Sequence, residues 1–421
     1  MCPHLESNQE CLLRTEGTQE RLLVHAKMLA VFRTHLSPRQ SRAFVYLANL
    51  LVSFHYFLVV YINSTFLSKY ISTGIISTLY LIGSVLSVIL FLVFSNLVKG
   101  IGNYRLVLVF ICLEICALAG LALAYSTGVI ILSFILYLVI SPIIYLNLDI
   151  FLEKFTKSEK DTGGIRGMFM TMQSITQVVA PLLVGYIMLA GEYKNVYLVS
   201  IGFLVAVAVL ISITFRNFND SHYSTHTMSA SLLYILKDKM LNKVFVAQNL
   251  LRFFYAWMVI YTPLYLIEYI GFSWSEIAVV FSIMLLPFLL LELPLGNLFD
   301  SRSMEKWVMA IGFVIMGITV ATIPMITTKV LWMWATVLFV SRIGAACVEM
   351  ATESYFFRHV DSSLADTISI FRMARPMTYV LAAATATLVL HMVSMKQSFF
   401  VLAVLVLLGV PCAFALQAKK K

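Results

Sequence analysis

The stretch NLLVSFHYFLVVY at residues 49–61 recurs in altered form as NLLRFFYAWMVIY at residues 249–261. An asparagine, two leucines, a phenylalanine, a valine and a tyrosine occupy matching positions, and the two stretches lie 200 residues apart. The same spacing separates DIFLE at residues 149–153 from EMATE at residues 349–353, and both segments carry a carboxylate pair at positions i and i+4. The chain therefore contains two similar halves.

The composition is that of a chain that lies in a lipid bilayer. The 421 residues are 60% hydrophobic and 12% charged, whereas soluble domains are about 45–50% apolar and about 25% charged. Apolar stretches of about 20 residues recur along the chain, and each can cross a hydrocarbon core of about 30 Å as a helix. Runs such as LVLVFICLEICALAGLALAY at residues 106–125 do not alternate, which excludes the strands of a membrane barrel. We therefore expect an all-α membrane protein.

Twelve transmembrane helices are predicted, in a first bundle of six over residues 42–215 and a second bundle of six over residues 242–417. The two bundles share one topology, so we expect a pseudo-twofold axis along the membrane normal. The predicted helices lie near residues 43–67, 73–98, 105–125, 128–153, 166–190, 195–215, 243–268, 275–299, 306–326, 330–356, 364–391 and 397–416.

Lysine and arginine are concentrated on one side of these bundles. They occur in an N-terminal tail at residues 1–41, where Met28 is an alternative start, in a linker at residues 216–241 and in a tail at residues 418–421. The positive-inside rule makes this side cytoplasmic, so we expect a multi-pass protein of the cell membrane with both termini in the cytoplasm. The net charge of +9 then reports topology and does not indicate nucleic-acid binding. One apolar face of the linker predicts a helix along the membrane surface, formed by Leu232, Leu233, Leu236 and Met240.

Patterns typical of enzymes and metalloproteins are missing from the sequence. The six cysteines are scattered, which predicts neither a disulfide framework nor a metal site. There is no Walker loop, no zinc-ligand spacing and no Ser/His/Asp cluster on one side of the predicted membrane. We therefore expect no enzymatic activity, no cofactor and no metal, and a monomer whose partners are the lipid bilayer and a small-molecule substrate.

The segment PLGNLFDSRSMEK at residues 294–306 is the most specific motif of the chain. Its Gly296 and Asp300 have the spacing of the signature loop between the second and third helix in each half of the major facilitator superfamily, which the chain resembles. Glycine allows close helix contact, and an aspartate at a helix end can bind backbone amides and a cation. The first half departs from this pattern, with Ser95 and Lys99 in place of the glycine and the aspartate.

The resemblance covers residues 42–416, and GGIRGMFMTMQSITQVVAPLLVGYI at residues 163–187 is similar to the fifth helix of the family. It implies a secondary transporter in which two bundles rock around a central site near the middle of the bilayer, opening it to each side in turn. The transported compound is expected to be a small organic solute. Energy would come from an ion gradient or from the gradient of the solute itself.

Charged residues within the predicted spans are candidates for the site, because each costs about 2.5–3.5 kcal/mol or more to insert at a helix centre. Arg342 is the strongest candidate, since it lies about 22 Å along its helix from the cytoplasmic end. The alternative is that these groups neutralise one another between helices, and that the histidine is a packed core residue. The substrate and cavity candidates are Arg342, Arg375, Arg372, Arg252, Glu292 and His55.

Two carboxylate pairs are candidates for proton coupling, Asp149 with Glu153 and Glu349 with Glu353. Two acids close together in a low dielectric tend to hold one proton. Arginines outnumber acids within the spans of the second half, which favours an anionic or zwitterionic solute. An uncoupled facilitator and a non-transporting sensor or assembly protein that retains the fold remain alternatives.

A cytoplasmic gate is predicted from the repeat. Asp300, with Gly296 at the same helix end, is expected to meet Arg166 at the start of the fifth helix of the first half. The 200-residue spacing places Asp366 at the position equivalent to Arg166. Lys99 is therefore expected to pair with Asp366, which is the same contact with its charges exchanged. The alternative is a lysine that faces only solvent and lipid headgroups.

Overall fold

The computed structural model describes residues 37–60, 62–123, 125–156, 161–188, 192–220, 223, 228–360 and 363–416. Most of the predicted N-terminal tail, the whole predicted C-terminal tail and Tyr61 of the repeated stretch lie outside these residues. The first half contains α2 (Pro38–Val60), α3 (Asn63–Leu67), α4 (Thr73–Ile101), α5 (Asn103–Leu123), α6 (Thr127–Lys154), α7 (Thr162–Met188) and α8 (Tyr193–Thr214).

The second half follows a short connecting helix. Its elements are α9 (Met228–Lys237), α10 (Lys239–Glu268), α11 (Trp274–Arg302), α12 (Glu305–Thr322), η2 (Ile323–Met325), α13 (Leu331–His359), α14 (Ala365–Met392), α15 (Met395–Leu407) and α16 (Gly409–Phe414). Each predicted span coincides with one of these helices or with a pair of them. The first and last predicted spans are each divided between two helices, α2 with α3 and α15 with α16.

Eleven helices among the described residues are long and apolar enough to cross a membrane, one fewer than predicted. The missing one is α14, which occupies the predicted place and contains 28 residues. Its first half carries Asp366, Arg372 and Arg375, which lower the mean hydropathy of the helix. α14 is therefore long enough to cross a membrane, and its charged residues are confined to its first half.

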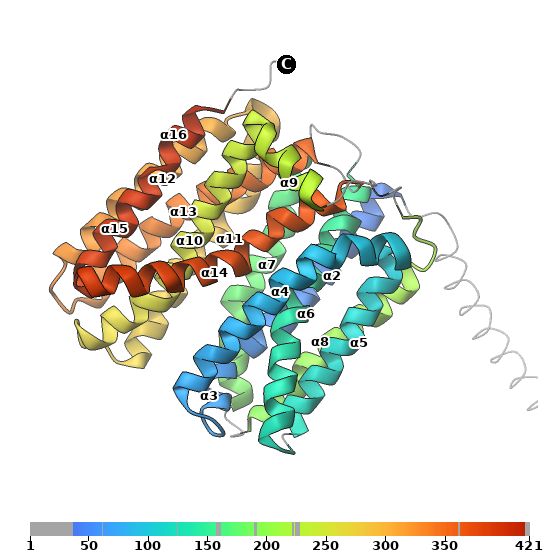
Figure 1. Ribbon diagram of the computed structural model, residues 1–421, viewed down its shortest axis with the longest axis horizontal. Helices are drawn as coiled ribbons and strands as arrows, with labels where there is room; N and C mark the ends of the chain where they lie inside the picture. Colours follow the sequence, from blue (N-terminus) through green and yellow to red (C-terminus); the bar gives the residue numbers. More distant parts are fainter. Residues whose placement is uncertain are drawn as a thin grey trace, which may run out of the picture.

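The helices form two bundles that lie side by side (Figure 1), with α2 to α8 in one and α10 to α16 in the other. The bundles meet mainly through α7 against α11 and through α4 against α14. Each contact joins the second long helix of one half to the fifth long helix of the other, as a pseudo-twofold relation requires. The two halves therefore enclose a shared interface that residues from both of them line.

The helix ends and one bend follow from local chemistry. Asp238 caps α10 by accepting hydrogen bonds from the backbone N–H groups of Met240 (2.9 Å) and Leu241 (2.8 Å). Met240 therefore lies in the first turn of α10 and does not extend the surface helix as predicted. Pro142 lies inside α6 and cannot donate to the carbonyl of Leu138. The hydroxyl of Ser87 on α4 donates to that carbonyl instead, at 3.1 Å.

The linker helix α9 keeps an apolar outer face. Ser231 and Ile235 are buried, whereas the side chains of Leu232, Leu233 and Leu236 are exposed. α9 packs against the start of the second half through α10 and α14. The position of this helix along a membrane surface stays a prediction.

Candidate functional site

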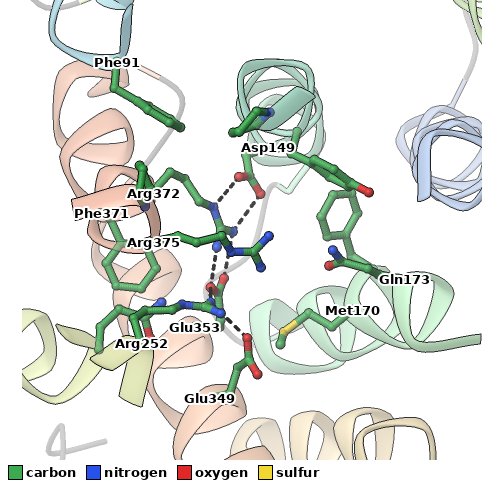
Figure 2. Close-up of a pocket in the computed structure, with 15 residues that line it drawn as sticks. Phe91, Asp149, Met170, Gln173, Arg252, Glu349, Glu353, Phe371, Arg372 and Arg375 are labelled. Atoms are coloured by element: carbon green, nitrogen blue, oxygen red, sulfur yellow. Dashed lines mark hydrogen bonds and ion pairs between the residues drawn. The ribbon is translucent and has the colours of Figure 1, made fainter. Parts of the chain in front are cut away.

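A cavity of about 60 Å³ lies at the interface of the two bundles. Its wall comes from α4, α6 and α7 of the first half and from α10, α13 and α14 of the second (Figure 2). The ionisable residues that line it are Asp149, Arg252, Glu349, Glu353, Arg372 and Arg375. Helical spacing brings them together, because residues three or four apart on α6, α13 and α14 share a face.

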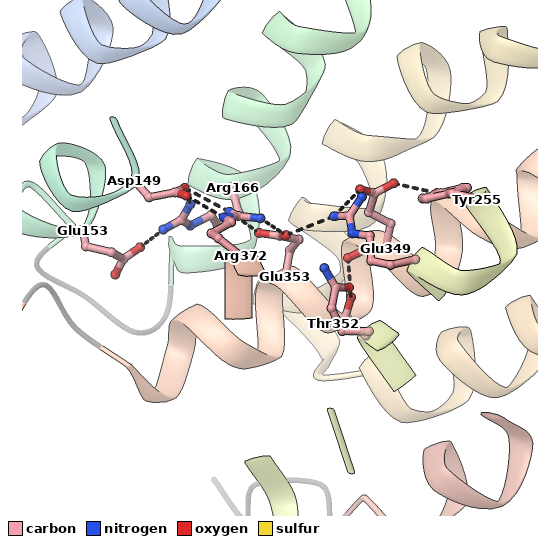
Figure 3. Close-up of polar contacts among 10 residues, drawn as sticks. Asp149, Glu153, Arg166, Tyr255, Glu349, Thr352, Glu353 and Arg372 are labelled. Carbon is pink, nitrogen blue, oxygen red and sulfur yellow. Dashed lines mark hydrogen bonds and ion pairs between the residues drawn. The ribbon is translucent and has the colours of Figure 1, made fainter. Parts of the chain in front are cut away.

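Arg372 on α14 joins the two bundles. Its Nε donates to Asp149 Oδ2 at 2.6 Å and its Nη2 donates to Asp149 Oδ1 at 3.0 Å, so the guanidinium binds this carboxylate of α6 with two hydrogen bonds. Arg372 also donates through Nη2 to Glu353 Oε2 on α13, at 2.8 Å. Two-point guanidinium–carboxylate contacts are among the strongest hydrogen bonds in proteins. Ion pairs of Arg372 therefore join the two bundles beside the cavity (Figure 3).

Arg166 on α7 lies beside the same aspartate and is fully buried. Its Nη1 donates to Asp149 Oδ1 at 2.6 Å, and its Nη2 donates to Glu153. The guanidinium carbon lies 3.2 Å from the ring centre of Phe357 on α13, over the face that attracts cations. Arg166 thus belongs to the cavity network and does not pair with Asp300, contrary to the prediction.

Arg252 on α10 completes the network. Its Nη2 lies 2.9 Å from Glu349 Oε1 and 3.8 Å from Glu353 Oε1. The hydroxyl of Tyr255 donates to Glu349 Oε2 at 2.7 Å. Each of the four acids predicted to couple protons therefore contacts at least one arginine. Arginine therefore offsets the repulsion between the two carboxylates of each pair, so neither pair needs a shared proton for that purpose.

Arg375 differs from the other cavity arginines. Figure 2 shows its guanidinium in the cavity, beside Arg372 and facing α7. Among the described residues, the guanidinium makes no ion pair and no hydrogen bond. It is therefore a cation that lines the interface with its binding capacity unused.

The Lys99–Asp366 pair forms as predicted, near the end of the bundles where α9 lies. Lys99 Nζ is 3.0 Å from Asp366 Oδ2, and the hydroxyl of Ser95 donates to Oδ1 of the same carboxylate. Asp366 is 2% exposed, so the lysine and the serine compensate a buried charge. The pair connects α4 of the first half to α14 of the second.

Asp300 makes the equivalent contact in the other half of the repeat, between α11 and α7, but its partners are backbone groups. It accepts hydrogen bonds from the backbone N–H groups of Gly163 (2.7 Å) and Gly164 (2.6 Å) at the start of α7. It also lies 3.2 Å from Arg358 Nη2 on α13. The N-terminus of a helix has free N–H groups and a partial positive charge, so the helix end itself serves as the partner. A Cβ at Gly163 would strike the carbonyl oxygen of Gly296, so the two backbones touch here.

Comparison with known proteins agrees with this architecture. Residues 244–421 match the family model of the Major Facilitator Superfamily. The second half of the chain is therefore similar in sequence to the Major Facilitator Superfamily. No curated protein matches the chain by sequence.

Solved structures of the superfamily share the fold over nearly the whole chain. The human organic anion transporter MFSD10 (TETRAN) superposes with a TM-score of 0.74 at 12% identity, covering 90% of this chain and 100% of that one. FucP in its outward conformation gives a TM-score of 0.73 at 14% identity, with 89% and 98% covered. A bacterial homologue of the iron transporter ferroportin, in its outward-facing state, gives 0.72 at 14% identity, with 89% and 98% covered. These likenesses establish the fold.

Three of the six predicted substrate residues line the cavity, namely Arg252, Arg372 and Arg375. Arg342 does not: it is 3% exposed, and its guanidinium carbon lies 4.9 Å from the ring centre of Phe254. Among the described residues its Nη1 has no hydrogen-bond partner. Arg342 was predicted from its distance along α13. Its side chain points toward α10 and not into the cavity.

Glu292 and His55 also lie away from the cavity lining. Glu292 accepts a hydrogen bond from the Ser174 hydroxyl at 2.8 Å, between α11 and α7. His55 is fully buried inside the first bundle. Two glutamines, Gln173 and Gln248, do line the cavity and were not predicted. An uncharged amide in an apolar span was the available signal for both.

The surplus of positive charge predicted for the second half of the chain is reduced by an acid of the first half. Arg372 binds Asp149, an acid of the first half. Among the lining residues, three carboxylates therefore stand against three arginines. The cavity as a whole is balanced in charge, and only Arg375 offers a free charged group.

Proposed function

We propose that this chain is a secondary transporter of the cell membrane that moves a small organic solute, chemically unchanged, by alternating access. Both bundles contribute to the wall of one cavity, and the Lys99–Asp366 and Asp300–Gly163 contacts join the bundles at the end where α9 lies. The basic loops at this end support its assignment to the cytoplasm. Rocking of the bundles would break those contacts and expose the cavity to the cytoplasm.

The solute class follows from Arg375, the observation that carries the proposal. A guanidinium without a counter-ion in a site of low dielectric favours a carboxylate or another anionic group. The lining charges sum to zero, so a zwitterion keeps the balance, whereas a cation meets only carboxylates already bound by arginine. An anionic or zwitterionic solute is therefore favoured over a cationic one.

Solute flux into proteoliposomes tests the proposal. Labelled anionic, zwitterionic and cationic organic solutes are compared, each with and without a pH gradient. We expect uptake of an anion or a zwitterion. Stimulation by the gradient would indicate proton coupling, and equal flux without it an uncoupled facilitator. Absence of flux for every class would favour the non-transporting alternative, and flux of cations alone would contradict the role of Arg375.

Variants at Arg375 make the test specific. Arg375→Gln removes the proposed hydrogen bond between the guanidinium and the solute, and a charged hydrogen bond is worth about 1.5–3 kcal/mol. We expect solute affinity to fall by about 10–100-fold. Arg375→Lys keeps the charge and should retain part of the affinity. Arg216→Gln, at an exposed arginine after α8, is the matched control.

A further inference from the structure

A second polar cluster lies inside the first bundle, away from the cavity. His55 on α2 and Glu114 on α5 are both fully buried, and His55 Nε2 lies 3.1 Å from Glu114 Oε1. Ser200 on α8 lies 2.7 Å from His55 Nδ1, and the Ser141 hydroxyl on α6 donates to Glu114 Oε1. Four helices thus place two titratable side chains in contact with each other and two hydroxyls around them.

The hydrogen bonds of Ser200 indicate which ring nitrogen of His55 faces Glu114. The Ser200 hydroxyl donates to the backbone oxygen of His55 at 3.2 Å, so its oxygen accepts from Nδ1–H of the ring. Nε2 is then the ring nitrogen that faces the carboxylate. One exchangeable proton between Nε2 and Oε1 gives a pair with no net charge, whether it lies on the imidazole or on the carboxyl. Without this proton the buried pair carries one negative charge.

No fixed cation compensates that negative charge. Among the described residues, no lysine or arginine contacts His55 or Glu114, and Glu114 Oε2 has no hydrogen-bond partner. An unpaired oxygen costs more on a buried carboxylate than on a neutral carboxyl group. Among the described residues, the other titratable groups near the pair are phenols of α6: the Tyr137 ring packs against His55, and Tyr137 and Tyr145 both lie within electrostatic reach of Glu114.

We infer that the His55–Glu114 pair is a proton-binding site, and that it supplies the proton that drives transport. The four acids of the cavity network are each held by arginine, so protonating one of them would break an ion pair. The buried pair gains a proton without losing any contact. The link to transport rests on the proposed function, whereas the binding of a proton does not.

The arrangement of a hydrolase triad is an alternative reading of the same residues. Ser200, His55 and Glu114 follow the order of nucleophile, base and orienting acid. Ser200 is fully buried, however, and its hydroxyl proton is directed to the backbone oxygen of His55. A nucleophile must reach a substrate carbonyl, and a proton needs only a transient path. Proton binding is therefore the reading that the burial allows.

α6 connects the proton site to the solute cavity. Ser141 binds Glu114, while the next residue, Pro142, and Tyr145 one turn further both line the cavity. Tyr145 lies within the electrostatic reach of both Glu114 and Arg375. A change of charge at Glu114 therefore acts on the helix that forms one wall of the solute site, at the point where Pro142 has already removed a backbone hydrogen bond.

Titration of the intact protein tests the proton site without any solute. The full chain, labelled with ¹⁵N-histidine and placed in lipid nanodiscs, is followed by NMR, and His55→Gln identifies the resonance. The pH is varied between about 5 and about 8, and we expect the His55 signal to change in a single transition. A proton on Glu114 would add the infrared band of a protonated carboxyl group with that change, whereas a proton on His55 would leave the carboxylate bands in place. A His55 signal that stays constant across this range would overturn the inference.

Two carboxyl variants assign the partner. Glu114→Gln should move or abolish the His55 transition and remove that infrared band where it appears, and Glu114→Asp provides a second variant if the glutamine chain does not fold. Glu292→Gln, at another buried carboxyl group, should leave the His55 transition in place. A transition that responds to Glu292→Gln and not to either Glu114 variant would contradict the pair.

Transport measurements then separate the proton site from the proposed function. With the solute found in the flux experiment, Glu114→Gln should retain exchange between equal pools, which needs no net proton movement. Accumulation driven by a pH gradient should fall to the level seen without a gradient. Titration of His55 in a protein that moves no solute would support the site and contradict the proposed function. Transport driven by a pH gradient without titration of His55 would do the reverse.

Discussion

The contact between Lys99 and Asp366 joins the two bundles through one pair of side chains. The aspartate is 2% exposed and the lysine side chain is 25% exposed, so the buried member depends on the partly hydrated one. Lys99→Asp would set two acids together, and we expect it to lower solute flux in proteoliposomes. Lys99→Asp combined with Asp366→Lys should restore part of that flux, because the attraction returns. Equal flux in the single and double variants would contradict a role for this pair.

Arg166 is the most deeply buried cation of the network. It bonds Asp149 and Glu153, so Arg166→Gln leaves Glu153 without its arginine and Asp149 with one instead of two. Breaking a buried ion pair in this way costs about 3–5 kcal/mol. We expect a clearly lower thermal midpoint of the purified protein in detergent, whereas Arg216→Gln at the exposed position should leave the midpoint unchanged. Similar midpoints for the two variants would show that the network contributes little to stability.

At the level of helices, the α7–α11 contact depends on two glycines. A Cβ at Gly163 would meet the carbonyl oxygen of Gly296, so Gly163→Ala should push the helix ends apart and weaken closure at this end. Gly185 lies on the same helix, and a Cβ there would meet nothing within 4 Å. Gly185→Ala should therefore be neutral or stabilising, by about 0.5–1 kcal/mol.

The readout for these glycine variants is the thermal midpoint together with the accessibility of a cysteine placed at the exposed position Ser301. Gly163→Ala should lower the midpoint and increase labelling from the proposed cytoplasmic side. Equal effects at Gly163 and Gly185 would assign the change to helix propensity and not to the close approach of α7 and α11.

For the whole molecule, Arg372 is the residue whose loss should change the balance between conformations. Arg372→Gln removes the two-point contact to Asp149, and a charged hydrogen bond is worth about 1.5–3 kcal/mol. The population of the conformation that is closed at the proposed cytoplasmic end should fall by about 10–100-fold relative to the population that is open there. Distances between spin labels at the exposed positions Arg105 and Ser301 measure this ratio. Arg302→Gln is the control, and identical distance distributions for both variants would reject the prediction.

Much of this architecture could be predicted from the sequence, because periodicity and repetition are properties of the sequence itself. Apolar runs located the helices, and the 200-residue repeat led to the contact between Lys99 and Asp366. The pair of Asp300 with Arg166, expected from the family signature, was wrong. Asp300 instead binds the backbone N–H groups of Gly163 and Gly164.

The direction in which a side chain points around its helix could not be predicted from the sequence. Depth along α13 follows from counting residues, but whether Arg342 points toward α10 or into the cavity depends on how the neighbouring helices pack. The bond between Arg372 and Asp149 likewise joins residues 223 positions apart that the repeat does not relate. The free Arg375 could be recognised only after the partners of the other arginines were known.

The shared position of Asp149 bears on how fast the two bundles can separate. Asp149 binds Arg166 of its own bundle as well as Arg372 of the other, and Arg372 also binds Glu353 of its own bundle. When the bundles part, each ion keeps a partner, so the several kcal/mol for stranding a buried ion do not enter the activation barrier. Within this network, opening exchanges the Arg372–Asp149 contact for water and leaves no ion without a partner, which suits the microsecond-to-millisecond timescale of domain motions.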